Sequence, residues 1–252
     1  MLVKSQGIVL REIKFEETSK ILTVFSRKDG KINAMAKGAL RPRSPLIACS
    51  QIFTYNDFNF FKGRNFYHIS QGEVLNSFYS IREDMKRLMW GYYLLELVEY
   101  SIVEEEPNEK LFKLLVKGLS VLSKLDSDFL KFVISFEIKA VSFIGYKPRL
   151  EKCVACGGDI EGDIRFSTRQ GGVICHNCFG TDFYSDEIDL SLLKYMQILL
   201  YTSLDNIGEI KIPKDVMFKI HSILVKYILQ RIDKKCFKSL NFIKSLENNG
   251  GI

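Results

Sequence analysis

Four cysteines in two closely spaced pairs are the residues of this chain best suited to chemistry. The pairs are Cys153-x2-Cys156 and Cys175-x2-Cys178, with eighteen residues between them. Each pair places two sulfur ligands on one tight turn, so two such turns can surround a single ion with four thiolates. Soft thiolates favour zinc or iron, and a loop of this length is typical of structural zinc ribbons. We therefore predict one structural Zn²⁺, bound without an open coordination position.

Other chemistry of the same four cysteines fits the sequence less well. Disulfides require an oxidising compartment, and the first residues, 1–4, lack the profile of a secretory signal. A thioredoxin-like redox pair explains one CxxC but not two. An iron–sulfur cluster uses the same ligands, although its common spacings differ. Zinc is therefore favoured, with His176 inside the second pair as an alternative ligand, while Cys49 and Cys236 are interpreted as ordinary thiols.

Signals for catalysis are weak in this sequence. It contains no GxxxxGK phosphate loop, no HExxH and no GxSxG motif. His68 falls on a predicted strand, His221 on a predicted helix and His176 in the second cysteine pair, and isolated histidines at such places usually have structural roles. We therefore expect a binding protein and not an enzyme.

The positive charge is concentrated in the first third of the chain. The net charge is +6, and residues 1–80 hold twelve Lys or Arg against six Asp or Glu, whereas residues 81–252 hold 24 of each sign. A basic module on a neutral scaffold favours a polyanionic partner, although a well-solvated surface without a partner fits the charge equally well. Apolar runs stay short of a membrane span, so we expect a cytoplasmic protein without a membrane partner.

Residues 1–80 have the pattern of short strands. Strand-like runs occupy 8–10, 21–25, 32–36, 52–61 and 66–75. Asp29-Gly30 and the segment 62–65 provide turn signals, and the connection 38–51 is long enough for a short helix. Five strands with a helical insertion between the third and fourth predict an OB-fold barrel. An SH3-like barrel or a small sandwich would fit the strand count nearly as well.

Basic residues gather in two loops of this predicted barrel. The predicted nucleic-acid-binding residues are Lys37, Arg41, Arg43, Lys62 and Arg64. Pro42 and Pro45 stiffen the first loop, and the second joins strands four and five, where OB domains line their binding groove. Five cations on single-stranded phosphates would give a salt slope of about −3.5. Most of the interleaved aromatic residues should belong to the barrel core, since alternate residues of a strand point inward.

From residue 81 the apolar period becomes helical. Helical stripes cover 85–95, 111–125 and 129–143, and they resume at 189–204 and 215–232. The predicted fold class is α+β multidomain, with an N-terminal OB-fold barrel followed by an all-α domain that carries an inserted four-cysteine zinc module. The predicted divisions are 1–80 for the barrel, 81–147 and 181–252 for the two parts of the helical domain, and 148–180 for the zinc module.

Several motifs occur in the order typical of one family. The chain opens with Gly7-Ile8-Val9-Leu10-Arg11 and Thr18-Ser19-Lys20-Ile21-Leu22, followed by Lys37-Gly38-Ala39-Leu40-Arg41-Pro42-Arg43-Ser44. Gly145-Tyr146-Lys147-Pro148 leads into the first cysteine pair, Gly171-Gly172-Val173-Ile174 leads into the second, and Lys238-Ser239-Leu240 lies in the tail. In order and spacing, these motifs resemble the RecO family of bacterial DNA repair and recombination mediators over almost the whole chain.

The resemblance implies a function that composition alone does not give. It implies binding of single- and double-stranded DNA and annealing of complementary strands. It also implies work with RecR and the single-strand-binding protein SSB to load RecA onto coated strands, in a bacterial cytoplasm and close to the nucleoid. Two other hypotheses stay open at this point: an RNA-binding or translation-associated protein, since OB barrels and zinc ribbons also recognise RNA, and a zinc enzyme.

Overall fold

The computed structural model describes residues 2–64 and 66–248, and it divides into two compact units. Unit 1 combines the chain up to Lys124 with the chain from Phe237 onward, and unit 2 is Leu125–Cys236. In the described residues, no helix is both long enough and apolar enough to cross a bilayer.

Unit 1 begins with a five-stranded barrel. The strands are β1 (Leu2–Phe15), β2 (Ser19–Ser26), β3 (Gly30–Ala36), β4 (Tyr55–Lys62) and β5 (Tyr67–Asn76). They close in the order β1-β2-β3-β5-β4, with β1 and β4 antiparallel and β3 and β5 parallel through Ala34 and Tyr67. This closed order confirms the predicted OB-like barrel.

Alternate residues of the strands fill the barrel. In β3, for example, Ile32, Ala34 and Ala36 are buried while the residues between them are half-buried. The outer face of β2 is covered as well, because Phe25 is fully buried and its ring meets that of Phe112 at 5.4 Å between centroids. Two apolar layers therefore hold unit 1 together, one inside the barrel and one between the barrel and its helices.

The helix expected within residues 38–51 is absent from the structure, so this expectation was wrong. Residues 37–54 instead form a series of turns, closed by backbone bonds such as Arg41 N–H to Gly38 C=O at 3.0 Å and Ser44 N–H to Arg41 C=O at 3.1 Å. Pro42 and Pro45 cannot donate the N–H groups that a helix would need, and Arg43 has a positive φ of 63°. The predicted fourth strand accordingly begins at Tyr55 and not at residue 52.

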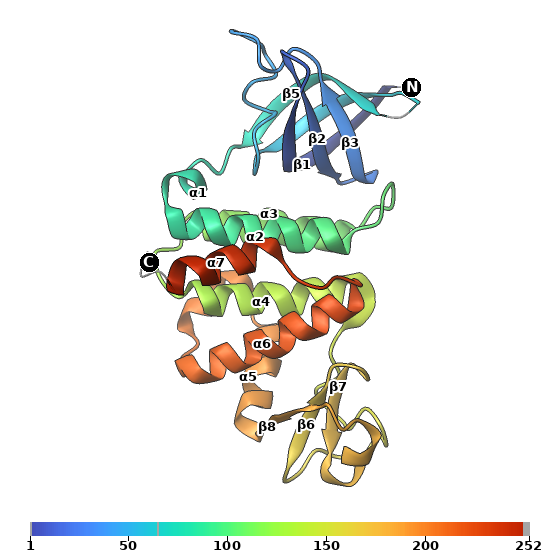
Figure 1. Cartoon of the computed structure of the whole chain (residues 1–252), viewed down its shortest axis with the longest axis vertical. Coiled ribbons are helices and arrows are strands. Elements are labelled where there is room, and N and C mark those ends of the chain that lie inside the picture. Colours follow the sequence, from blue (N-terminus) through green and yellow to red (C-terminus); the bar gives the residue numbers. More distant parts are fainter. Residues whose placement is uncertain (1, 65, 249–252) are drawn as a thin grey trace. The chain divides into compact units, whose positions relative to one another are not determined.

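Helices complete unit 1. They are α1 (Ser80–Glu83), α2 (Met85–Ser101), α3 (Glu109–Leu122) and α7 (Lys238–Asn248). Asp84 and Asn108 start α2 and α3, because each side chain accepts the backbone N–H three residues on. Helix α7 is not among the helices expected from the sequence; it returns from the far end of the chain to lie alongside α2 (Figure 1).

Unit 2 contains helices and a small sheet. Its helices are α4 (Phe129–Val141), α5 (Leu190–Tyr201) and α6 (Lys214–Arg231), with a π-helical turn at Ser142–Tyr146 and 3₁₀ turns at His176–Thr181 and Leu204–Glu209. Strands β6 (Ile164–Ser167), β7 (Gly172–Cys175) and β8 (Asp186–Ile188) form a sheet in the order β7-β6-β8. Gly145, with a φ of 96°, and the following Pro148 end the α4 segment, as the sequence indicates.

The buried helix α4 carries charged groups into the middle of unit 2. Glu137 is fully buried and lies 3.0 Å from Nδ1 of His221 on α6. Lys139 donates to the carbonyl oxygens of Leu199 and Leu200 at 2.6 and 2.7 Å. His221 thus has a structural setting, and the last carbonyls of α5 receive a cation that favours the negative end of the helix dipole.

The compact units do not divide the chain at the positions expected from the sequence. Helices α2 and α3 belong with the barrel in unit 1, and the last helix joins them there. The boundaries 1–80, 81–147, 148–180 and 181–252 remain a prediction about domains.

Candidate metal centre and nucleic-acid interface

The four predicted cysteine ligands lie together in unit 2. The Sγ atoms of Cys153, Cys156, Cys175 and Cys178 all lie within 4.8 Å of one another, and those of Cys156 and Cys175 are 3.8 Å apart. Ligands about 2.3 Å from a tetrahedral Zn²⁺ would be separated by about 3.8 Å. The cluster therefore has the dimensions of a four-sulfur metal site.

Glycines allow the chain to bring the two pairs together. Gly157 takes a φ of 74° and closes the first turn, with its N–H bonded to the carbonyl oxygen of Cys153 at 2.8 Å. Arg149 runs beside the start of β7, where a Cβ on Gly172 would come within 2.5 Å of the Arg149 oxygen. Strand β7 then ends at Cys175, next to the first pair. The second pair is thus positioned by a hairpin that needs glycine at its close approach.

The electrostatics of the cluster favour a bound cation. Burial works to raise the pKa of Cys153, but N–H donors from the backbone, with Cys175 first among them, lower it to about 6. The neighbouring sulfur of Cys156, followed by burial, raises the pKa of Cys178 to about 12. Thiolates this close repel one another, and a positive ion removes that cost.

His176 is not part of the cluster. No histidine belongs to the group of close ligand atoms found among the described residues, and the ring of His176 instead meets that of Phe179 at 5.2 Å. Four thiolates fit a soft or borderline cation such as zinc, and they leave no position for a water molecule. The arrangement can hold structure, and its donor set provides no group for hydrolysis.

The first predicted basic loop is exposed and anchored at its base. Gly38 N–H bonds to Ser19 Oγ at 3.3 Å, and Leu40 N–H bonds to the Thr18 oxygen at 2.8 Å. The three cations of this loop, Lys37, Arg41 and Arg43, are exposed, and their side chains make no hydrogen bond or ion pair within the described part of the chain. A polyanion could therefore approach them without first displacing an acidic side chain.

The second predicted pair lies at the other end of the barrel. Strand β3 runs from Gly30 toward Lys37, and β5 runs parallel to it, so the turn that precedes Tyr67 faces the beginning of β3. Lys62 and Arg64 are exposed there, but Lys62 bonds to Glu105 at 2.8 Å, which raises the pKa of the lysine. The five predicted cations therefore do not form one cluster.

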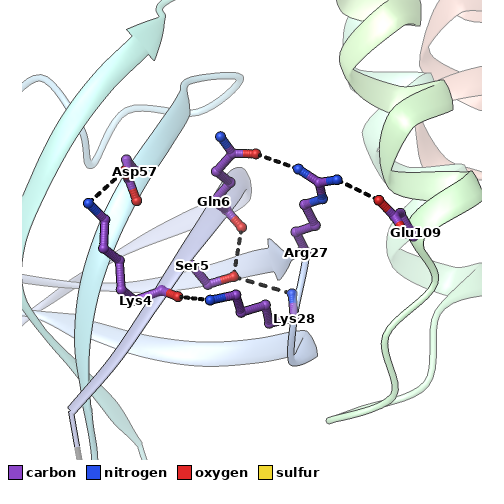
Figure 2. A pocket seen from close by; sticks show the side chains of 7 residues that line it. All are labelled: Lys4, Ser5, Gln6, Arg27, Lys28, Asp57 and Glu109. Carbon is purple, nitrogen blue, oxygen red and sulfur yellow. Dashed lines mark hydrogen bonds and ion pairs between the residues drawn. The ribbon is translucent and has the colours of Figure 1, made fainter.

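Three cations that the sequence patterns do not single out line a depression on the barrel. Lys4, Arg27 and Lys28 line a hollow of about 520 Å³ together with Asp57 and Glu109, as Figure 2 shows. Lys4 pairs with Asp57 at 3.1 Å, and Arg27 pairs with Glu109 of α3 at 2.5 Å. The signal available in the sequence was the pair Arg27-Lys28, directly before the turn residues Asp29-Gly30.

Comparison with known protein families shows the family to which this chain belongs. Residues 1–78 match the model described as "Recombination protein O N terminal", and residues 82–241 match that described as "Recombination protein O C terminal". The chain belongs to the RecO family. The two matches meet between β5 and α2, so the family's N-terminal part corresponds to the barrel.

Individual relatives agree over nearly their full lengths. The chain is 40% identical to "DNA repair protein RecO" of Alkaliphilus metalliredigens, over 98% of this chain and 100% of the relative. It is 33% identical to the protein of that name from Acetivibrio thermocellus, over 97% of both chains, and 32% identical to that from Bacillus subtilis, over 98% and 96%. The resemblance seen in the motifs is thus confirmed, and the chain is a DNA repair protein of the RecO family.

Proposed function

We propose that this chain binds single- and double-stranded DNA and anneals complementary strands without catalysing a covalent step. Together with RecR, it would help to load RecA onto strands coated with SSB. The observation that carries the DNA-binding part is the exposed basic loop of Lys37, Arg41 and Arg43 on a closed OB-like barrel, in a chain of the RecO family. The loop offers charge to a phosphate backbone irrespective of sequence.

Annealing needs no active site. Two complementary strands repel through their phosphates, and a protein that neutralises part of both backbones lowers this repulsion and leaves base pairing to drive the product. The barrel and its basic loops supply cations for that purpose. RecR and SSB are assigned as partners on the family relationship alone.

We further propose that the ion of the cysteine cluster is Zn²⁺ and that its role is structural. Bound zinc would neutralise the four thiolates and tie the segment before β6 to the end of β7, so that two cysteine pairs eighteen residues apart in the chain are held together. The distance of 3.8 Å between the Sγ atoms of Cys156 and Cys175 supports this assignment, because it equals the sulfur–sulfur distance of about 3.8 Å expected around a tetrahedral Zn²⁺.

The test of DNA binding is the removal of the three loop cations. In the variant K37A/R41A/R43A, the affinity for a single strand should fall at least about tenfold near 0.15 M salt, and the salt slope should shrink by about 2. Fluorescence anisotropy over a series of salt concentrations measures both. The control variant is K211A/K214A/K219A, which removes three exposed lysines from unit 2 and changes the net charge equally.

Equal affinity and slope in the loop variant and the wild type would contradict the role of the loop. Competition between DNA and RNA strands of the same sequence separates DNA repair from the RNA-binding alternative. Strong preference for RNA would contradict the proposed function itself.

A further inference from the structure

Helix α3 carries a stripe of lysines that the proposed function has not used. Lys110, Lys113 and Lys117 stand at positions i, i+3 and i+7, a spacing that places them on one face of the helix. All three are exposed. Successive lysines rise about 4.5 and about 6 Å along the helix, so they can meet phosphates one or two nucleotides apart on one strand.

This stripe borders the barrel. A hollow of about 250 Å³ between α3 and the barrel is lined by Gln6, Arg27 and Tyr55 on the barrel side and by Phe112, Lys113 and Lys117 of α3. Its lining shares Gln6 and Arg27 with the depression of Figure 2, and that depression extends the surface to Lys4 and Lys28. The two hollows therefore form one surface, here called the α3–barrel track, which runs from Lys4 to Lys117.

The α3–barrel track has an excess of positive charge. The two hollows are lined by five cations, Lys4, Arg27, Lys28, Lys113 and Lys117, but by only two carboxylates, Asp57 and Glu109. Both carboxylates are already engaged, since Asp57 pairs with Lys4, and Glu109 bonds to Arg27 at 2.5 Å and to Lys113 at 3.1 Å. This leaves a basic surface that suits an extended anion.

The shape of the α3–barrel track favours a polynucleotide over a small anion. The cations come from three places in unit 1, namely β1, the turn after β2, and α3, and they are spread over two adjoining hollows. The half-buried ring of Tyr55 lines the smaller hollow together with Arg27, Lys113 and Lys117, and it meets the ring of Phe112 at 6.1 Å between centroids. Proteins that bind single strands commonly combine a row of cations with an aromatic ring on which a base can stack.

We propose that the α3–barrel track binds the phosphate backbone of a second strand while the loop of Lys37, Arg41 and Arg43 holds the first. Arg27 and Lys28 follow the end of β2, whereas Lys37 follows the end of β3, and these two antiparallel strands end on opposite sides of the barrel. The two basic surfaces can therefore be occupied by different strands. This inference rests on the proposed function and adds where the second strand lies.

The test uses two labelled, non-complementary single strands and the full chain. Energy transfer between the labels reports a complex that holds both strands, and anisotropy of one label reports the first binding event. In the variant K28A/K113A/K117A, binding of the first strand should stay within about twofold of the wild type. The affinity for the second strand should fall at least about tenfold, with a salt slope smaller by about 2.

Matched variants separate the explanations. The control K211A/K214A/K219A should keep the second strand, and an equal loss there would contradict a role for the track and indicate a general effect of charge. Lys110 lies outside the two hollows but on the same face of α3 as Lys113 and Lys117. Lys110→Glu reverses an exposed charge that makes no bond to a described residue, so this variant should fold normally and still weaken the second strand by repulsion beside the track. Unchanged second-strand binding in both track variants would overturn this inference alone, whereas a wild type that binds no strand would overturn the proposed function.

Discussion

The ammonium group of Lys139 shows how a single buried charge is accommodated. It lies within the apolar interior around α4 and is held by the carbonyl oxygens of Leu199 and Leu200 at the end of α5. Burial lowers its pKa from the ordinary value to about 8. The lysine side chain thus joins two helices at the expense of part of its solvation.

This pKa predicts how stability depends on pH. The folded chain releases the Lys139 proton near pH 8, whereas the unfolded chain keeps it to about pH 10.4. The unfolded state therefore binds more protons between these values, and the contribution of this group to the free energy of unfolding should increase as the pH rises through that window. Urea unfolding of the wild type and of Lys139→Met at pH 8, 9 and 10 measures the difference, and equal slopes in the two proteins would contradict this assignment.

The cysteine cluster allows a direct test of its metal. Cys153→Ser removes the buried member of the cluster, so the chain should lose most of its bound zinc, and hydrogen exchange in β6 and β7 should accelerate. The control is Cys236→Ser, an exposed thiol that lies outside the cluster. Elemental analysis reports the metal, and one equivalent of zinc retained in the Cys153 variant would show that the cluster is not the site.

The four cysteines of the cluster can be recognised in the sequence because their spacing is local. Residues whose partners lie in distant segments of the chain cannot be recognised in this way. Two CxxC pairs indicate one another directly, so the four cysteines could be found before the structure. Nothing near Lys139 in the sequence points to the carbonyl groups of Leu199 and Leu200, sixty residues away. Likewise, Arg27 joins Lys113 of α3 in one basic surface only because the Glu109 carboxylate bonds to both side chains.

At the scale of elements, α7 depends on two contacts made across most of the chain. The Glu96 carboxylate accepts the backbone N–H groups of Lys238 and Ser239 at 2.9 Å each, and it also bonds to the Ser239 hydroxyl. This carboxylate caps the start of the helix and favours the positive end of its dipole. Immediately before the helix, buried Phe237 packs on Tyr93 with 5.2 Å between ring centroids.

These contacts predict that α7 can be loosened selectively. Glu96→Ala should lower the stability of unit 1 by about 1–2 kcal/mol, because the first N–H groups of α7 lose their acceptor. Phe237→Ala should cost about 3–5 kcal/mol through lost burial. Urea unfolding with hydrogen exchange of α7 measures both, and the control is Glu83→Ala, an exposed acid. Exchange in α7 that stays at the wild-type level in both variants would show that these contacts do not hold the helix.

The helices and strands that the sequence predicts correctly are those set by local patterns. Strand alternation and turn residues are local, so the sequence predicts five strands and their order along the chain, although β1, β2 and β3 extend beyond the expected runs. The length of the segment between β3 and β4 is compatible with the helix expected there, but Pro42 and Pro45 lack the N–H groups that a helix needs, and turns form instead. Helix α7 was missed because its stabilising contacts, Glu96 and Tyr93, lie far away in the sequence.

At the scale of the whole molecule, the proposed DNA-binding surfaces and the cysteine cluster occupy different compact units. The barrel, the basic loop and the α3–barrel track belong to unit 1, and the cysteine cluster belongs to unit 2. The excess of positive charge in residues 1–80 indicates a binding surface on the barrel. It does not indicate the lysines of α3, because residues 81–252 carry equal numbers of positive and negative side chains. Local helical spacing, and not regional net charge, was the signal for that stripe.

The central claim is that this chain promotes strand annealing by neutralising phosphates. The most direct measurement is the annealing rate of complementary strands coated with single-strand-binding protein, with and without this chain, followed by energy transfer between end labels. The account predicts acceleration by the wild type that falls as salt rises, and little acceleration by K37A/R41A/R43A. No acceleration by the correctly folded wild type, or equal acceleration by the loop variant at every salt concentration, would contradict it.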